Sequence, residues 1–150
     1  GETHLDLVGD PAALNRLRLV LLRLVRRVRA SSDDSITPSQ RSTLGTVHHF
    51  GRVSIGQIAE HEHVQPPSAS KVVSALEQMG LVQRDTDPDD RRTSLISLTP
   101  TGFDAVDTMR AAGLGFLAQR LADLDPGDVA TLQDALPALE RLLGGIDDDR

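Results

Sequence analysis

The chain has 150 residues, a formal net charge of −6, 39% hydrophobic and 25% charged residues, and no cysteine. This length and composition fit one globular domain with its own core, and exclude disulfides and sensing by thiol oxidation. The longest apolar run, Leu17–Val28, is interrupted by four arginines, so we expect no membrane span and no membrane partner. The start of the chain lacks the pattern of a signal peptide, which favours a cytoplasmic protein.

The charge is unevenly distributed along the sequence. A net negative charge argues against a nucleic-acid partner, because domains of that kind usually present a basic surface. However, six of the 16 basic residues lie within Arg16–Arg29, and three more, Arg84, Arg91 and Arg92, cluster further along. Acidic residues crowd the end of the chain, at 147–149. Since a local patch decides contact with phosphate, DNA binding stays open.

The first predicted helix, over 11–30, begins at Asp10 followed by Pro11. Its apolar residues recur at helical spacing and form one stripe: Leu14, Leu17, Leu21, Leu24, Val25 and Val28. Leu19 and Leu22 lie outside that stripe, and one small core cannot cover both sides. We therefore expect a partner subunit on one side. The alternative is a helix buried at the centre of its own monomer.

Two short helices and an amphipathic helix follow in the sequence. Thr37, followed by proline, predicts a helix that ends near Phe50, and Ser54 predicts the start of a third helix. The stretch Pro67–Gly80 predicts a short amphipathic helix that a glycine ends. On a helical wheel its core side carries Ala69, Val72, Val73, Leu76 and Met79. Its opposite side carries Pro67, Lys71, Ser74 and Gln78, with Ser70 at the edge.

A β-hairpin comes next, with one strand from Val82 and a second containing Leu95, Ile96 and Leu98. Between the strands, 85–92 is too acidic and proline-bearing to bury, so it predicts a long polar tip with two adjacent arginines. Hydroxyl and amide groups on the preceding helix can offer hydrogen bonds to base edges and phosphates. A solvated helix face shows the same pattern, but the neighbouring arginines favour DNA.

The last third of the chain predicts two further helices. Thr99 and Asp125, each followed by a proline, mark their starts. Gly113 and Gly115 are weak points where the first of them can bend, and Pro137 should kink or break the second. Both helices, like the first of the chain, carry surplus apolar residues, which predicts a dimerisation module.

The hairpin sequence Asp-Pro-Asp-Asp-Arg-Arg, followed by Leu-Thr-Pro-Thr-Gly, resembles that of the MarR family (multiple antibiotic resistance regulators). In element order the resemblance covers nearly the whole chain, with its specific motifs in 54–102. It implies a mainly α fold with a small β-wing, in one domain over 1–150: a winged helix-turn-helix at 37–98 and dimerisation helices at 11–30 and 99–145. It also implies a homodimeric regulator of transcription that binds inverted repeats in double-stranded DNA, a repressor released by a small organic effector.

The same resemblance implies which residues contact DNA. Groove contacts fall on Ser68, Ser70, Lys71 and Ser74, with Pro67 on the same outer face. Lys71 stands where arginine is commoner in the family. As a point charge, lysine cannot make the two-pronged contact of arginine with guanine, so weaker base reading is expected there.

At the hairpin tip, Asp89 and Arg91 have the spacing of the Asp-x-Arg element of the family. The resemblance implies that Asp89 helps to fix the tip while an arginine enters the minor groove, whose potential attracts arginine where it is narrow. We favour Arg91 there, with Arg92 on phosphate, although either could insert. Arg84, at the base of the hairpin, is a candidate phosphate contact. The alternative is that the tip arginines only balance the nearby aspartates.

Histidines invite two other interpretations. His61 and His63, two residues apart on one helix, point in different directions and lack further ligands, so we expect no metal site. His48 and His49 could border a ligand pocket of the kind the family resemblance implies, but ordinary packing residues are the favoured interpretation.

No enzyme motif is present: the sequence holds no nucleophile elbow, phosphate-cradling glycine loop or metal triad. We therefore expect no enzymatic activity and no cofactor. The rival function is a winged-helix protein-interaction scaffold without DNA binding, which would explain the acidic charge but not the paired arginines.

Overall fold

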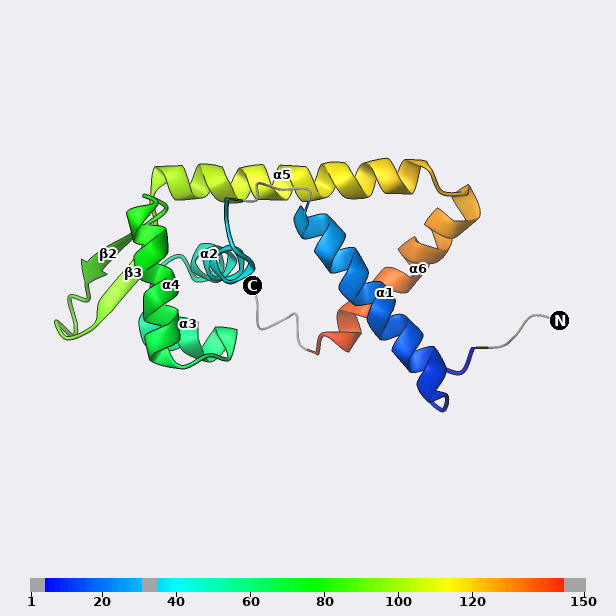
Figure 1. Cartoon of the computed structure of the whole chain (residues 1–150), viewed down its shortest axis with the longest axis horizontal. Helices are drawn as coiled ribbons and strands as arrows, with labels where there is room; N and C mark the ends of the chain where they lie inside the picture. The colour runs from blue at the N-terminus through cyan, green and yellow to red at the C-terminus, as the bar shows by residue number, and fades with distance from the viewer. Residues whose placement is uncertain (1–4, 31–34, 145–150) are drawn as a thin grey trace.

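The computed structural model describes residues 5–30 and 35–144 (Figure 1). Its elements, in chain order, are α1 (Pro11–Ala30), α2 (Pro38–Phe50), β1 (Val53–Ser54), α3 (Ile55–Glu62), α4 (Pro66–Gln78), β2 (Val82–Thr86), β3 (Ser94–Leu98), α5 (Pro100–Ala122) and α6 (Pro126–Leu142). Residues 35–98 form the winged lobe, and α1, α5 and α6 are the terminal helices. The long helix α5 runs from the winged lobe to the end of the molecule where α1 and α6 lie (Figure 1). The mainly α fold with a small β-wing is confirmed.

Helix starts in the winged lobe follow the capping signals of the sequence. The hydroxyl groups of Thr37 and Ser54 each accept a hydrogen bond from a backbone N–H three residues on, at 3.1 Å. In turn, the side-chain oxygens of Gln40 and Gln57 accept hydrogen bonds from the backbone N–H groups of Thr37 and Ser54, at 3.0 Å. Each pair satisfies two backbone N–H donors that have no partner within the helix. A cap of this kind stabilises the folded protein by about 1 kcal/mol. The predicted starts of α2 and α3 are therefore confirmed.

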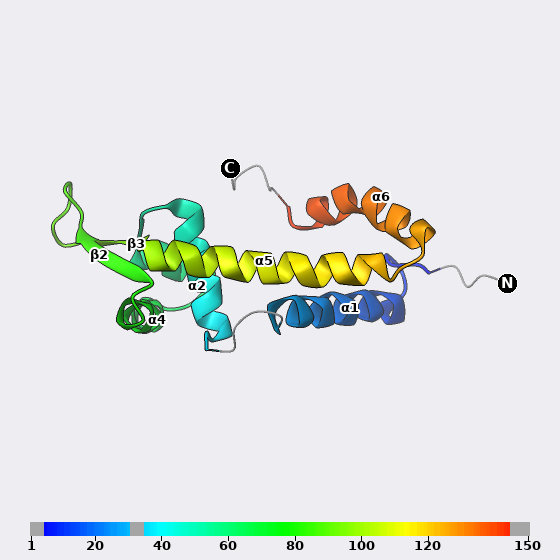
Figure 2. The same cartoon turned by 90° about the horizontal axis from the view of Figure 1, so that it is seen from above.

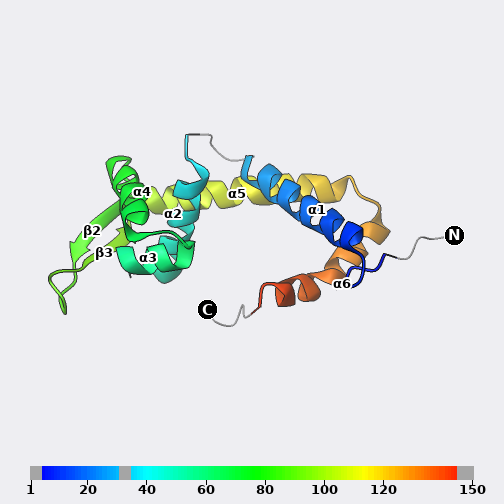
Figure 3. The same cartoon turned by 60° about the horizontal axis from the view of Figure 1, so that its bottom comes forward.

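The β-sheet has the strand order β1-β3-β2, with antiparallel pairing throughout. The hairpin pairs Val82 with Leu98 and Thr86 with Ser94, which confirms the two predicted strands. Strand β1, which places Val53 opposite Ile96, was not predicted because a two-residue strand shows no periodicity. It ties β3 to the body of the lobe. The hairpin tip projects beyond the helices of the lobe (Figures 2 and 3).

The hydrophobic core lies inside the winged lobe. Seven large side chains there have essentially no exposed surface: Leu44, Ile58, Leu76, Ile96, Val47, Val53 and Val73. They come from every helix and strand of the lobe except β2, which contributes the buried Val82. Of the terminal helices, only α5 adds to this core, through Val106. The core therefore fixes α4 and the hairpin relative to each other.

The Thr-Pro-Thr-Gly segment attaches α5 to the winged lobe by close contacts. The Thr99 hydroxyl donates to the carbonyl oxygen of Gly80 at 2.5 Å and accepts from the Gly102 N–H at 3.0 Å, so it caps α5. A side chain at Gly102 would place its Cβ 2.0 Å from the carbonyl oxygen of Leu81, which only glycine avoids. In this chain, close packing of α5 on the winged lobe therefore explains the threonine and the glycine of the Thr-Pro-Thr-Gly segment.

The terminal helices leave their apolar side chains exposed. Helix α1 buries only Ala13, and α6 buries no residue. Large apolar side chains at least 40% exposed include Leu14, Leu22, Leu24, Val25, Leu114, Leu117, Leu132 and Leu136. The alternative that α1 is buried in its own monomer is therefore wrong. Helices α1 and α6 flank α5 on opposite sides (Figure 2).

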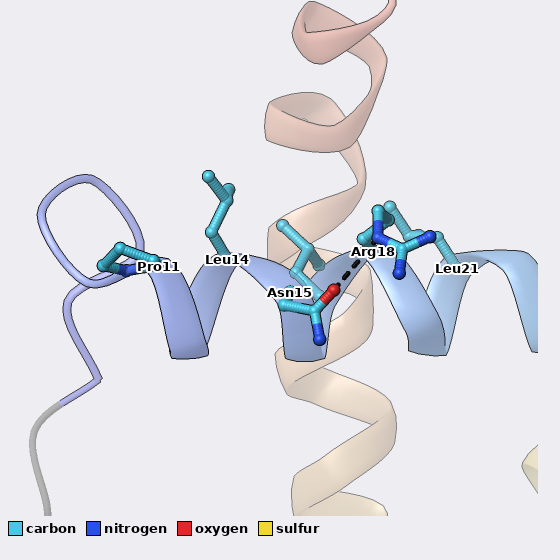
Figure 4. A pocket seen from close by; sticks show the side chains of 6 residues that line it. Pro11, Leu14, Asn15, Arg18 and Leu21 are labelled. Atoms are coloured by element: carbon cyan, nitrogen blue, oxygen red, sulfur yellow. Dashed lines mark hydrogen bonds between the residues drawn. The ribbon is translucent and has the colours of Figure 1, made fainter.

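Part of this exposed surface lies on α1, where Leu14 and Leu21 line a hollow beside Asn15 and Arg18 (Figure 4). The Arg18 Nε donates to Asn15 Oδ1 at 3.1 Å, so the polar pair is satisfied locally. No helix in the described ranges is both long and apolar enough to cross a membrane.

The glycines and the proline inside the terminal helices do not end them. The sequence predicts a kink or a break at Pro137, and of these the break is absent, because helix α6 continues through this residue. The proline still removes one backbone donor. Helix α5 continues through Gly113 and Gly115. Gly113 is buried because α1 crosses it closely: a Cβ added there would lie 3.3 Å from Cγ1 of Val28.

Candidate DNA-binding surface

Helix α4 lies on the core along one face and presents the other outward. Pro66 and Pro67 occupy its first positions, where a missing backbone N–H costs no helical hydrogen bond. Ala69, Val73 and Leu76 are at most 2% exposed. The spacing of these apolar residues therefore fixes which side chains α4 can offer to a partner.

The end of α4 differs from the helical wheel, which places Met79 on the buried side. Met79 is 40% exposed, so that prediction is wrong. The helix ends at Gln78, and Gly80 has a φ of 75°, so the chain turns away before Met79 reaches the core. The N–H of Leu81 donates to the carbonyl oxygen of Leu76 at 3.0 Å and closes the helix end.

The outward face of α4 brings together the groove contacts expected from the sequence. Pro67, Ser68 and Lys71 are exposed, and Ser70 and Ser74 are half-buried. Among the described residues, the side chains of Ser68, Ser70 and Lys71 take part in no hydrogen bond or ion pair. This face therefore offers hydroxyl groups and one positive charge to an external partner.

Arg84 lies on β2 and reaches back to α4. Its Nη2 donates to Ser74 Oγ at 2.9 Å, and its Nε lies 3.3 Å from Glu77 Oε1. The Arg84 side chain is 29% exposed. The sequence predicts a phosphate contact at Arg84 and does not predict this link. A signal for it exists, because Ser74 and Glu77 are three residues apart and share one helix face.

The wing tip is held by its own aspartates. The backbone N–H of Asp87 donates to the carbonyl oxygen of Thr93 at 2.9 Å. The Asp90 carboxylate accepts from the Arg92 N–H at 3.0 Å and from the Thr93 hydroxyl at 3.1 Å. The sequence assigns the fixing role to Asp89, but Asp89 contributes only its N–H, which donates to Asp87 Oδ1 at 2.9 Å. The carboxylates of Asp87 and Asp90 hold the tip instead.

Arg91 and Arg92 are exposed at the wing tip. Neither side chain makes a hydrogen bond or ion pair with any part of the chain that the structure describes. The alternative that these arginines only balance the nearby aspartates is therefore supported by no ion pair among the described residues. Arg92 lines a hollow between the wing and the start of α3, together with Ser54, Gly56 and Arg84.

Helix α3 is fastened to α2 by a carboxylate that sequence reasoning left unexplained. Glu62 Oε2 accepts from the Ser42 hydroxyl at 2.6 Å, and Glu62 Oε1 accepts from the Thr46 hydroxyl at 2.5 Å. Next to it, His63 adopts a φ of 56° and ends α3 in the left-handed conformation. These contacts set the turn that leads into α4.

His48, His49 and His61 are packed against aromatic rings. His48 meets Phe103 of α5 edge-on at 6.1 Å between ring centroids, and His49 meets Phe50 at 4.8 Å. The hollow between α1 and α2 is lined by residues such as Val25, Arg29 and Arg41, and includes neither histidine. Within the described ranges, no three histidine, aspartate or glutamate side chains gather where they could hold a metal ion.

Comparison with known sequences finds one family. A family model described as the MarR family matches residues 36–94. The chain is 35% identical, over 128 residues, to an uncharacterized HTH-type transcriptional regulator of Mycobacterium bovis, covering 85% of this chain and 90% of the relative. It is 26% identical, over 116 residues, to the HTH-type transcriptional repressor MdtR of Bacillus subtilis, covering 74% and 75% of the two chains.

Comparison with solved structures agrees. A putative transcriptional regulator from Pseudomonas aeruginosa PA01 matches with a TM-score of 0.81 and 29% identity, covering 91% of this chain and 97% of the other. A mutant of S. aureus MepR bound to an oligodeoxyribonucleotide matches with a TM-score of 0.67 and 20% identity, covering 86% and 96%. At that identity, the second match shows a shared fold alone.

Proposed function

Because the chain belongs to the MarR family of transcriptional regulators, we propose that it is a homodimeric repressor that binds inverted repeats in double-stranded DNA. Proteins of this family are regulators and not enzymes, as the sequence predicts. DNA binding and transcriptional regulation follow from the family. The repressor role, the inverted repeat and release by a small ligand are the proposal for this chain.

The observation that carries the proposal is the pairing of two exposed features on one lobe. The outward face of α4 offers Ser70 and Lys71, and the wing beside it offers Arg91 and Arg92, all outside the core. A short helix face rich in hydroxyls suits the major groove, while arginine suits a narrow minor groove. In this proposal, α4 supplies base contacts together with Ser68 and its neighbours. The wing supplies minor-groove and phosphate contacts, with Arg91 in the groove and Asp89 beside it.

The homodimer is supported by the exposed apolar surface of the terminal helices. Leu14 on α1, Leu114 on α5 and Leu136 on α6 are all more than half exposed. Contiguous exposed apolar surface usually marks an interface. A second copy that covers these helices would place two winged lobes in one symmetric particle, and the two-fold symmetry would match an inverted repeat.

Repression and release by a small ligand are each supported by a separate observation. The relative MdtR is named a transcriptional repressor. Hollows lie where α1 meets α2 and where α1 meets α5, between the winged lobe and the terminal helices. A ligand bound there would act on the relative position of the two lobes. His48 and His49 stay candidates for its border only through their place on α2. As a DNA-binding regulator of transcription, the protein should act in the cytoplasm.

Selection of bound sequences from random duplexes, followed by a gel-shift assay at low salt, tests the proposed function. Two half-site centres should lie about one helical turn apart, roughly 10 base pairs, as dimeric helix-turn-helix proteins require. An unrepeated site would contradict the symmetric dimer. Absence of any enriched sequence, with no shift of duplex DNA at low salt, would favour the protein-interaction scaffold.

A further inference from the structure

We infer that Arg84 is a positioning residue that orients the Ser74 hydroxyl and biases it toward donating a hydrogen bond to the DNA bases. This inference rests on the proposed function and adds a specificity rule to it. The role differs from a phosphate contact, in which Arg84 would add affinity for any duplex. It also assigns Ser74 a defined chemical preference.

The geometry joins three side chains from two elements. Arg84 on β2 donates through Nη2 to Ser74 Oγ at 2.9 Å and through Nε to Glu77 Oε1 at 3.3 Å. The two contacts use two different nitrogens of one planar guanidinium group, so they fix its orientation as well as its position. Glu77 thereby holds the arginine in place while the arginine holds Ser74.

A serine hydroxyl can donate one hydrogen bond and accept two, and its proton rotates to suit the partners. At Ser74 the oxygen already accepts from Arg84, which can only donate. Among the described residues, the Ser74 hydroxyl donates to no acceptor. Its proton therefore points away from the guanidinium group, and with one of its two acceptor positions occupied Ser74 favours donation to an external partner more than a free hydroxyl would.

This polarity has a consequence for base reading. In the major groove, guanine, adenine and thymine present acceptor atoms, whereas cytosine presents an amino donor. A serine held as a donor should disfavour cytosine at the base it contacts. Ser74 lies on the outward side of α4 and is half-buried beside the wing, so one position in each half-site should show this bias.

The experiment is sequence selection from random duplexes with the full chain and with Arg84→Ala, Arg84→Lys and Ser74→Ala, together with the salt dependence of binding. For wild type, cytosine should be depleted at one position of each half-site. In Arg84→Ala, both acceptor positions of the Ser74 oxygen are free and the hydroxyl can rotate, so it accepts from cytosine more readily. Cytosine should then return at that position by a few-fold to about tenfold, the worth of one hydrogen bond.

Two comparisons separate positioning from a direct phosphate contact. Arg84→Lys keeps the charge but loses the fork that spans Ser74 and Glu77, so cytosine should return while the salt slope stays near that of wild type. Ser74→Ala should remove the bias, and adding Arg84→Ala to it should change the preference no further. Arg110→Ala, an exposed arginine on α5, controls for the loss of one charge. Thermal unfolding confirms that each variant is folded.

The outcomes are distinct. If Arg84→Ala lowers affinity equally for all sequences and reduces the salt slope by roughly one unit, Arg84 is a phosphate contact and the inference is overturned. If wild type itself enriches no sequence, the proposed function fails and the inference fails with it. If Arg84→Lys keeps the bias of wild type against cytosine, the positioning role is also overturned.

Discussion

The winged lobe buries its large apolar side chains, whereas the terminal helices leave theirs exposed. In the lobe, Leu44, Ile58 and Leu76 have no exposed surface. In the terminal helices, Leu114 is 61% exposed and Leu136 is 55% exposed. Helices α1 and α6 have the apolar periodicity of amphipathic helices, as the lobe helices do, whereas the apolar residues of α5 are spread around the helix. The surplus of apolar residues on the terminal helices is the sequence signal that separates them from the lobe. What differs is whether this chain supplies the surface that covers the apolar side.

This difference shows how one chain divides its tasks. The lobe packs its own core, which holds α4 and the wing in one rigid unit. The outward side chains of that unit form the candidate DNA-binding surface. The terminal helices meet at few close points, one being Gly113 against Val28. Their apolar surface is left for a partner, and we propose that the partner is a second copy.

The largest effect should follow from a cavity in the winged lobe. Leu76→Ala removes a fully buried side chain from α4, which should lower the free energy of unfolding by about 2–5 kcal/mol. Urea unfolding at a fixed protein concentration measures this change. A loss below about 1 kcal/mol would mean that the core is not the close-packed unit described above.

The proposed dimer surface should respond to a charge. Leu136→Glu on α6 would bury a carboxylate in an apolar interface, and we expect dissociation constants for the dimer raised roughly 100-fold or more. Ala138→Glu, on the opposite side of the same helix, adds the same charge at an exposed position and is the control. Sedimentation velocity over a range of concentrations measures both. Equal behaviour of the two variants would contradict an interface at Leu136.

The wing should matter for DNA binding and not for folding. Arg91→Ala removes an exposed side chain, so thermal stability should stay almost unchanged while affinity for duplex DNA falls roughly tenfold and the salt slope by about one unit. Arg110→Ala on α5 serves as the control. Should Arg91→Ala and Arg92→Ala both bind like wild type, the wing takes no part in DNA binding.

The smallest effect should distinguish two glycines of α5. Gly115→Ala meets no atom within 4 Å and should stabilise the helix by about 0.5–1 kcal/mol. Gly113→Ala places a Cβ 3.3 Å from Val28, so part or all of that gain should be lost. Thermal unfolding of the two variants compares them. An equal gain would show that α1 does not pack closely on α5.

Local signals predicted most of the fold. Caps such as Thr37, Ser54 and Thr99 act within four residues, so the helix starts could be predicted from sequence. At Pro137 the helix is not broken, because a proline lowers helix stability without deciding the outcome when the surrounding residues continue the helix. Strand β1 forms only through pairing with a strand some forty residues later, which no local pattern records.

The candidate site was predictable in its residue types but not in its contacts. Sequence placed Ser70 and Lys71 correctly on the outward side of α4. It could not show that Glu62 would bind hydroxyls of α2, because that contact joins residues 16 and 20 positions apart. The link between Arg84 and Ser74 was not predicted because it also depends on how the strand returns beside the helix, although the face that Ser74 shares with Glu77 is a signal for it.

The most direct test of the central claim is the mass of the full chain in solution at micromolar concentration, measured by sedimentation equilibrium. If a second copy covers the terminal helices, the particle should have twice the 16.2 kDa of one chain and should stay folded. A folded, well-behaved monomer at that concentration would contradict the claim, because the apolar surface of α1, α5 and α6 would then have no partner.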